Sequence, residues 1–173
     1  MGTRAPMIRA VRDLVPFPRS VMANPLAFGG GFPNISVLMI DANEDDRGYY
    51  ARGLRSSSTD YLVFEAGSGG LGLDLYRTHR IDCVVLELFL PDMDALEVIA
   101  TIVPMAQRQT VAVVGLTRWS SRTLTDIALQ KGVQTCLVKS ETSSDALERG
   151  IQNAISAVLA HRTHTTSEYL PLN

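Results

Sequence analysis

Five short, unbroken apolar runs constrain the fold of this chain more than any other feature of its sequence. The runs cover residues 37–40, 61–64, 83–86, 111–114 and 136–138. They are rich in valine and continuous rather than alternating, which is typical of strands buried on both faces of a sheet. All are far shorter than the roughly 20 apolar residues that cross a bilayer. The pattern therefore predicts a buried sheet and no membrane span.

The segments between the runs have helical periodicity. In residues 142–160, Leu147, Ile151, Ile155 and Val158 fall on one stripe. Residues 95–103 repeat this spacing. Strands that alternate with helices predict an α/β fold in which a five-stranded parallel sheet has helices on both faces.

Composition narrows the class of protein. The chain has 173 residues, of which 46% are hydrophobic and 20% charged, and its net charge is -2. These values are typical of one globular domain, and the charge gives no strong field for nucleic acid or an anionic membrane. Cys83 and Cys136 lie in apolar runs, which predicts reduced thiols in a cytoplasmic protein rather than a disulfide.

The two ends of the chain differ from its centre. Residues 1–34 contain five prolines, a Phe-Gly-Gly-Gly-Phe stretch at 28–32, and four arginines against one acid. An Arg-rich start can be a transit peptide, but prolines interrupt any long helix, so we interpret 1–34 as a flexible arm or a partner-binding strap. Residues 35–160 form the predicted domain, and 161–173 read as a tail.

Polar side chains stand where four of the predicted strands end. They are Asp41, Glu87, Thr117 and Lys139. Parallel strands bring their carboxyl ends to one edge of the sheet, where ligands and chemistry gather. Each residue alone is unremarkable at a strand end, but two carboxylates, a hydroxyl and an ammonium together predict a functional site.

These residues also carry a family resemblance. The stretches 37–41, 84–94, 113–117 and 137–139 resemble, in order and spacing, the motifs of the receiver domain of bacterial response regulators. The resemblance runs from about residue 36 to residue 160. It implies a three-layer, flavodoxin-like (βα)5 fold that takes a phosphoryl group from a histidine kinase onto an aspartate beside Mg2+.

Several positions depart from the family's pattern. The resemblance implies a pair of acids after the first strand, and here they are Asp41 and Ala42. The phosphoacceptor position holds Glu87, while Thr117 and Lys139 match the hydroxyl and the lysine that contact the phosphoryl group. The aromatic switch residue is replaced by Cys136.

These departures predict an atypical receiver that does not cycle phosphate. Glu87 is one methylene longer than aspartate, and positional errors near 1 Å can cost about 100-fold in rate. Asp41 and Glu87 would bind Mg2+ weakly at most, since Ala42 has no carboxylate, so we expect no cofactor. Lys139 is expected to pair with Glu87. The partner is expected to be a histidine kinase or a downstream output protein.

A nucleotide-binding domain is the main alternative. Gly67, Gly69 and Gly72 fit G-x-G-x-x-G after a predicted strand, with Glu87 about 20 residues further on. A complete strand-helix unit precedes this motif, which does not fit the dinucleotide-binding arrangement. An enzyme is not expected, because no nucleophile-histidine pair is indicated.

A surface for self-association is also predicted by the resemblance. Receivers commonly pair through the fourth helix, the fifth strand and the fifth helix. The matching positions carry mixed charges that suit self-complementary pairing. They are Arg122, Asp126, Lys131, Glu141 and Arg149. We therefore expect a homodimer.

Overall fold

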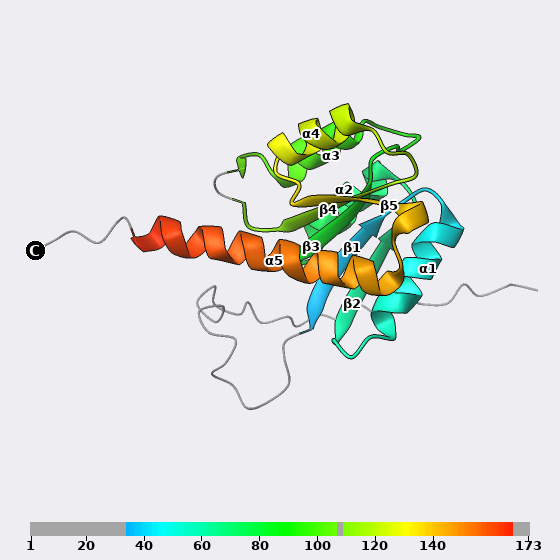
Figure 1. The fold of residues 1–173 in the computed structure, drawn as a ribbon, viewed down its shortest axis with the longest axis horizontal. Coiled ribbons are helices and arrows are strands. Elements are labelled where there is room, and N and C mark those ends of the chain that lie inside the picture. The colour runs from blue at the N-terminus through cyan, green and yellow to red at the C-terminus, as the bar shows by residue number, and fades with distance from the viewer. Residues whose placement is uncertain (1–33, 107–108, 168–173) are drawn as a thin grey trace, which may run out of the picture. The chain divides into compact units, whose positions relative to one another are not determined.

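The computed structural model describes residues 34–106 and 109–167, the last six of them by their backbone alone. Strands and helices alternate along this part of the chain (Figure 1). The strands are β1 (Ile35–Ile40), β2 (Tyr61–Ala66), β3 (Cys83–Glu87), β4 (Ala112–Thr117) and β5 (Thr135–Val138). The helices are α1 (Glu44–Arg55), α2 (Gly69–Thr78), α3 (Ala95–Ile102), α4 (Arg122–Gln130) and α5 (Ser144–Ser167), with a 3-10 turn, η3 (Lys139–Glu141), before α5.

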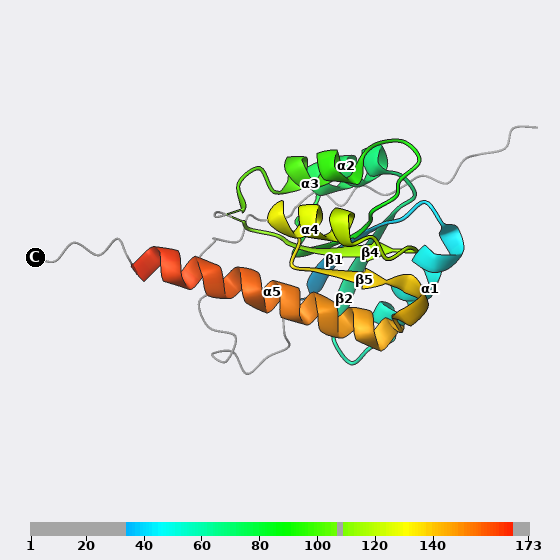
Figure 2. The ribbon, with the colours of Figure 1, turned by 45° about the horizontal axis from the view of Figure 1, so that its top comes forward.

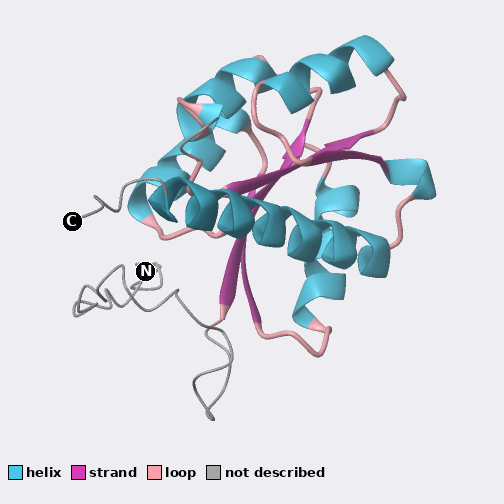
Figure 3. Ribbon diagram, turned by 60° about the vertical axis from the view of Figure 1, so that its left-hand side comes forward, coloured by secondary structure: helices cyan, strands magenta, loops and turns pink. Residues whose placement is uncertain are grey.

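The strands form one parallel sheet in the order β2-β1-β3-β4-β5. The chain moves outward from β1 to β2 on one side and from β3 to β5 on the other, so the topological switch point lies between β1 and β3. Figure 3 shows the twisted strands between the layers of helices. The predicted parallel α/β fold is confirmed, and ligands of such sheets bind at the carboxyl edge near the switch point.

Two separate cores explain why the apolar runs are continuous. In β1, Leu38 and Ile40 pack in the core under α2, α3 and α4, whereas Val37 and Met39 pack in the core under α1 and α5. Figures 1 and 2 show these two layers of helices on opposite faces of the sheet. All four side chains are completely buried. Where both faces of a strand are covered, as over residues 37–40 of β1, successive side chains enter one core or the other, which gives an unbroken apolar run.

The helices begin at short polar side chains that satisfy free backbone N–H groups. Asn43 caps α1, Ser68 caps α2, Asp94 caps α3 and Ser121 caps α4, each through a side-chain oxygen that accepts from the first turn. At α5 the Ser143 hydroxyl accepts from the Ala146 N–H at 3.2 Å. These caps fix where each helix starts relative to the strand before it.

Close packing of α2 on β1 depends on one glycine. A Cβ atom at Gly72 would lie 2.4 Å from Cδ1 of Ile40. The glycine therefore allows α2 to approach the strand that carries Asp41 at its end. The two cysteines lie on β3 and β5 with β4 between them, and they are free thiols as predicted.

The C-terminal boundary differs from the prediction. Helix α5 continues to Ser167, so the expectation of a non-helical tail from residue 161 is wrong as far as 167. No glycine or proline interrupts the chain between Gly150 and Pro171. Among the residues of α5 whose side chains are described, Val158 is the last buried one. The predicted arm, residues 1–34, lies outside the described residues except for Asn34. None of the described helices is long and apolar enough to cross a membrane.

Candidate functional site at the carboxyl edge

Four charged side chains from four different elements meet at the carboxyl edge of the sheet. The Nζ atom of Lys139 lies 2.6 Å from Asp41 Oδ2, 2.6 Å from Glu87 Oε2 and 3.0 Å from Asp46 Oδ2. We call these four residues the Lys139 cluster. The predicted contact between Glu87 and Lys139 is present, and Asp41 joins it as expected from the strand order.

Asp41 and Glu87 are held from the backbone as well. Oδ1 of Asp41 accepts from the Asn43 N–H at 2.9 Å, and Oε1 of Glu87 accepts from the Phe89 N–H at 3.1 Å. In each carboxylate, one oxygen thus accepts a hydrogen bond from the loop that follows the strand, and the other oxygen contacts Lys139. Asp41 is 1% exposed and Glu87 5% exposed. Buried carboxylates need such partners because the cost of removing a charge from water is large.

Asp46 enters the site from the first turn of α1. Its backbone N–H donates to the Asn43 side chain at 2.8 Å, so the helix cap fixes its position. Its carboxylate also accepts from Arg118, with Nη2 at 2.8 Å and Nε at 3.2 Å. Asp46 was not predicted as a site residue, because the sequence did not indicate which of the three acids at 44–46 faces the strand ends.

The electrostatics of the cluster favour the charged forms of Asp46 and Lys139. Burial alone would lower the pKa of the Lys139 ammonium, but hydrogen bonds to Asp41, Glu87 and Asp46 outweigh burial and raise the pKa. Burial would likewise raise the pKa of Asp46, but hydrogen bonds from Arg118 and Lys139 lower the pKa overall. The ammonium therefore stays protonated and Asp46 stays ionised over the physiological range.

Lys139 is positioned by the turn after β5. The Tyr50 hydroxyl donates to the carbonyl oxygens of Thr142, at 3.0 Å, and Lys139, at 3.3 Å. The Thr142 hydroxyl donates back to the Val138 carbonyl at 2.7 Å. These bonds fix the backbone of η3, so the Lys139 side chain extends into the site with 7% of its surface exposed.

Thr117 lies beside the cluster but bonds to its own loop. Its hydroxyl donates to the Trp119 carbonyl at 3.2 Å and accepts from the Trp119 N–H at 3.3 Å. Thr117 is buried, with 2% of its surface exposed. The structure therefore brings Asp41, Glu87 and Lys139 together, whereas the Thr117 hydroxyl closes the turn between β4 and α4.

The cluster does not fit Mg2+ in this arrangement. Mg2+ requires near-octahedral oxygen ligands and keeps several waters. One oxygen of each of the three carboxylates contacts the Lys139 ammonium, and Ala42 supplies no side-chain oxygen. Among the described residues, no group of three or more His, Cys, Asp or Glu side chains is placed to hold a metal ion. The ammonium itself takes the central position between the acids.

The glycine motif has a structural role in the fold. Its residues open α2 after β2, as predicted, but the N–H groups of Gly69 and Gly70 each donate to the Asp92 carboxylate at 3.0 Å. These bonds lower the pKa of Asp92. A dinucleotide would need N–H groups at this helix end for its phosphates. Here a carboxylate of the same chain binds them.

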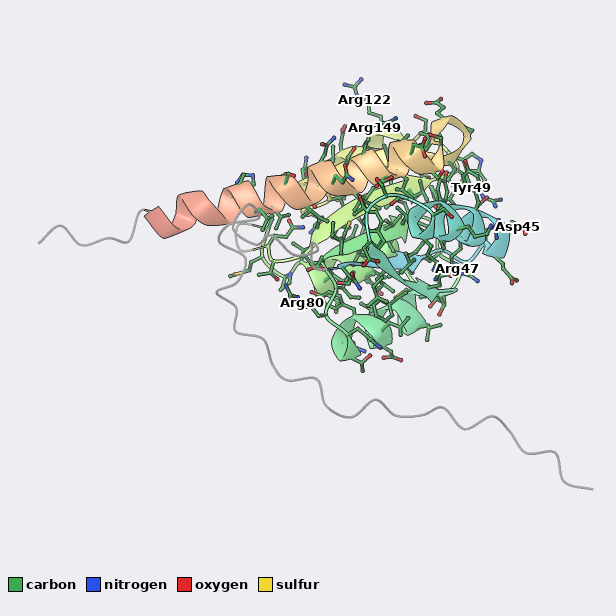
Figure 4. All side chains as sticks on the ribbon, turned by 90° about the horizontal axis from the view of Figure 1, so that it is seen from below. Asp45, Arg47, Tyr49, Arg80, Arg122 and Arg149 are labelled. Carbon is green, nitrogen blue, oxygen red and sulfur yellow. The ribbon has the colours of Figure 1, made fainter. Side chains whose placement is uncertain are left out.

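The predicted self-association residues all lie on the surface. All five are exposed, on α4, at the residue that follows it, on η3 and on α5: Arg122, Asp126, Lys131, Glu141 and Arg149. Figure 4 shows the side chains of Arg122 and Arg149 projecting outward from the molecule. None of the ion pairs between described residues joins two of these five. The homodimer stays a prediction.

Comparison with known proteins identifies the family to which the chain belongs. The family model of the response regulator receiver domain matches residues 37–151. The chain is 32% identical over 120 residues to the transcriptional regulatory protein GlrR of Escherichia coli, covering 69% of this chain and 26% of that protein. It is 26% identical over 111 residues to a protein-glutamate methylesterase/protein-glutamine glutaminase of Rhodospirillum rubrum, covering 64% of this chain and 29% of that protein.

The fold agrees with solved structures. A CheY-like response regulator receiver domain protein from Methanospirillum hungatei superposes with a TM-score of 0.65 at 16% identity, covering 74% of this chain and 98% of that chain. The chain spans less than a third of the length of the two curated relatives above. Since the family model covers more than half of the sequence, this chain belongs to the response regulator receiver domains of two-component signalling.

Proposed function

We propose that this receiver domain is a protein-interaction module rather than an enzyme, and that it signals without phosphorylation of Glu87. The observation that carries the proposal is the Lys139 cluster, in which one ammonium contacts three carboxylates at 2.6–3.0 Å. Both oxygens of Glu87 are engaged, one by Lys139 and one by the Phe89 N–H. Glu87 carries one permanent negative charge, one methylene further from its backbone than the charge of an aspartate at this position.

The partner class follows from the family. Receiver domains interact with histidine kinases and output proteins, and we propose a partner of one of these two kinds for this chain. Two interpretations of Glu87 remain open at this point. Its fixed charge can hold the domain in one active-like state, or it can form a structural ion pair that has no role in signalling.

Phosphoryl transfer provides the direct test. The protein is incubated with acetyl phosphate and Mg2+, and its intact mass is measured. We expect no added phosphoryl group, because a glutamate misplaces its carboxylate and Ala42 gives no metal ligand. The Glu87→Gln variant serves as the matched control, since it keeps the shape of the side chain and cannot form an acyl phosphate.

The outcome separates the alternatives clearly. A stoichiometric adduct on the natural protein that is absent from Glu87→Gln would overturn the proposal. An adduct of equal size on both proteins would place phosphate at another residue and would leave Glu87 unphosphorylated.

A further inference from the structure

The three carboxylates of the Lys139 cluster surround a cation that belongs to the chain itself. Asp41 follows β1, Glu87 ends β3 and Asp46 lies in the first turn of α1. One oxygen of each lies 2.6–3.0 Å from the Lys139 Nζ atom, so three oxygens from separate elements converge on one point. An ammonium has three N–H donors and carboxylates are also ligands of divalent cations, so this point suits a cation of either kind.

The ammonium neutralises these acids only in part. The three carboxylates are negative, and two positive groups are in ion-pair contact with them among the described residues. These groups are Lys139, which contacts all three, and Arg118, which pairs with Asp46 alone. A divalent ion in place of the ammonium would balance the remaining negative charge. The charge of the site therefore favours a divalent cation, whereas the chain supplies a monovalent one.

Lys139 and an incoming ion need the same oxygens. The other oxygens of Asp41 and Glu87 accept from backbone N–H groups of the loops that follow their strands. An ion at this point therefore has to displace the ammonium. The Tyr50 hydroxyl donates to the Lys139 carbonyl, which fixes the backbone that carries the side chain. A group tethered at a site competes at a high effective concentration, so the ammonium has the advantage over a free ion.

We propose that Lys139 is the resident cation of this receiver domain and keeps divalent cations out of the site, so that the carboxyl edge holds one arrangement whatever the divalent cation concentration. The same carboxylates hold the loops after β3 and β4, through the Phe89 N–H and through Arg118. The surface that these loops form is therefore independent of a metal ion. This inference rests on the proposed function, since it names what keeps the site in one state without phosphate.

Removal of the ammonium tests the proposal. Lys139→Met keeps an unbranched side chain and leaves three acids facing one point. Ca2+ is the main probe, because it accepts flexible oxygen geometry at about 2.3–2.6 Å, whereas Mg2+ needs about 2.0–2.1 Å. We expect Lys139→Met to bind Ca2+ at least about tenfold more tightly than the natural protein, by calorimetry at constant ionic strength. Ca2+ should also raise the unfolding temperature of this variant more than that of the natural protein.

Two further variants localise the effect. Lys131→Met removes an exposed lysine and should bind Ca2+ no more tightly than the natural protein. Glu87→Gln in the Lys139→Met background removes one of the three acids, so at least about tenfold of Ca2+ affinity should be lost again. This double variant also has less repulsion among its acids and so separates metal binding from folding. If Lys139→Met folds only when Ca2+ is present, the Ca2+ dependence of folding measures the same binding.

Four results would contradict the proposal. The natural protein could bind Ca2+ or Mg2+ as tightly as Lys139→Met binds Ca2+, or Lys131→Met could show an equal gain. Glu87→Gln could leave the gain unchanged, or Ca2+ could neither bind to Lys139→Met nor fold it. No phosphoryl donor is present in these measurements. Failure here therefore leaves the acetyl phosphate result standing, and a phosphoryl adduct there leaves the Ca2+ result standing.

Discussion

The two edges of the sheet satisfy their polar side chains in different ways. At the amino edge, Ser36 donates to Asp82 Oδ2 from its N–H at 2.9 Å and from its hydroxyl at 2.7 Å. The side chains of Gln109 and Gln134 bond to each other, with a 3.0 Å bond from Gln134 Nε2 to Gln109 Oε1. At the carboxyl edge, by contrast, three carboxylates share the single ammonium of Lys139.

The difference lies in the charge that depends on one residue. At the amino edge the Gln134 side chain bonds the Gln109 side chain, the Val113 N–H and the Gly132 carbonyl, but all of these groups are neutral. Removing Lys139 would leave Asp41, Asp46 and Glu87 close together without their common cation. Buried charges that lose their partner are far more costly than neutral groups that do. The carboxyl edge therefore concentrates ionised groups around one ammonium, whereas the amino edge satisfies its polar groups mainly by neutral hydrogen bonds.

The largest effect is expected from Lys139→Met. This change keeps an unbranched side chain and removes the ammonium, which leaves three acids without their shared counter-charge. We expect the free energy of unfolding to fall by about 3–5 kcal/mol at neutral pH. Denaturant unfolding measures it, with Lys131→Met as the matched control at an exposed lysine, where the expected change is about 0.5 kcal/mol or less. Equal losses in the two variants would contradict the central role of Lys139.

A smaller effect is expected at the amino edge from Ser36→Ala. The change removes the hydroxyl that donates to Asp82 and accepts from its N–H at 3.1 Å. We expect a loss of about 1–2 kcal/mol, because a backbone donor still reaches Asp82. Ser156→Ala, at an exposed hydroxyl on α5 that bonds only to Gln152, should change stability little.

The double variant sharpens the comparison between the edges. Ser36 and Lys139 belong to separate networks, so their losses should add within about 0.5 kcal/mol. A large coupling energy would mean that the two edges act as one unit, and the contrast drawn above would fail.

The sequence predicts the sheet and most of the cluster for physical reasons. Continuous apolar runs are typical of strands with a core on both faces, as in β1, β3 and β4, although the run in the edge strand β2 leaves Leu62 49% exposed. The carboxyl ends of parallel strands meet at one edge of the sheet. That reasoning places Asp41, Glu87 and Lys139 together, and the structure agrees.

The features of the site that the sequence did not predict depend on the directions in which individual side chains point. Asp46 reaches Lys139 because the cap at Asn43 fixes the residue at which α1 begins. A helix that began one residue earlier or later would turn a different acid toward the strand ends. Thr117 bonds to the Trp119 backbone, and Asp92 binds the start of α2, through loop conformations that have no periodic pattern in sequence. Helix α5 continues to Ser167, past the end of the apolar stripe in the sequence, so apolar periodicity could not locate its end.

The smallest effect concerns the pH dependence that Asp46 gives to the carboxyl edge. Hydrogen bonds from Arg118 and Lys139 outweigh burial and lower the pKa of Asp46 below its ordinary value of 3.8. A carboxyl whose folded pKa is depressed stabilises the protein above its unfolded pKa and loses that contribution as pH falls through the folded value. Asp46→Asn should therefore cost a constant amount, about 1 kcal/mol or less because the side chain is partly exposed, between about pH 5 and pH 9.

Once the pH falls below the lowered pKa of Asp46, the natural protein and Asp46→Asn should converge in stability, because protonation removes the same charge that the substitution removes. Lys139 responds in the opposite direction. Its pKa lies above the ordinary 10.5, so its contribution is complete at neutral pH and is lost only as pH rises through that higher value. Urea unfolding at several acidic and alkaline pH values measures the loss of the Asp46 contribution in acid and of the Lys139 contribution in alkali. A difference between the natural protein and Asp46→Asn that persists unchanged into strong acid would mean that Asp46 acts through packing rather than charge, and the carboxyl edge would then resemble the amino edge at this residue.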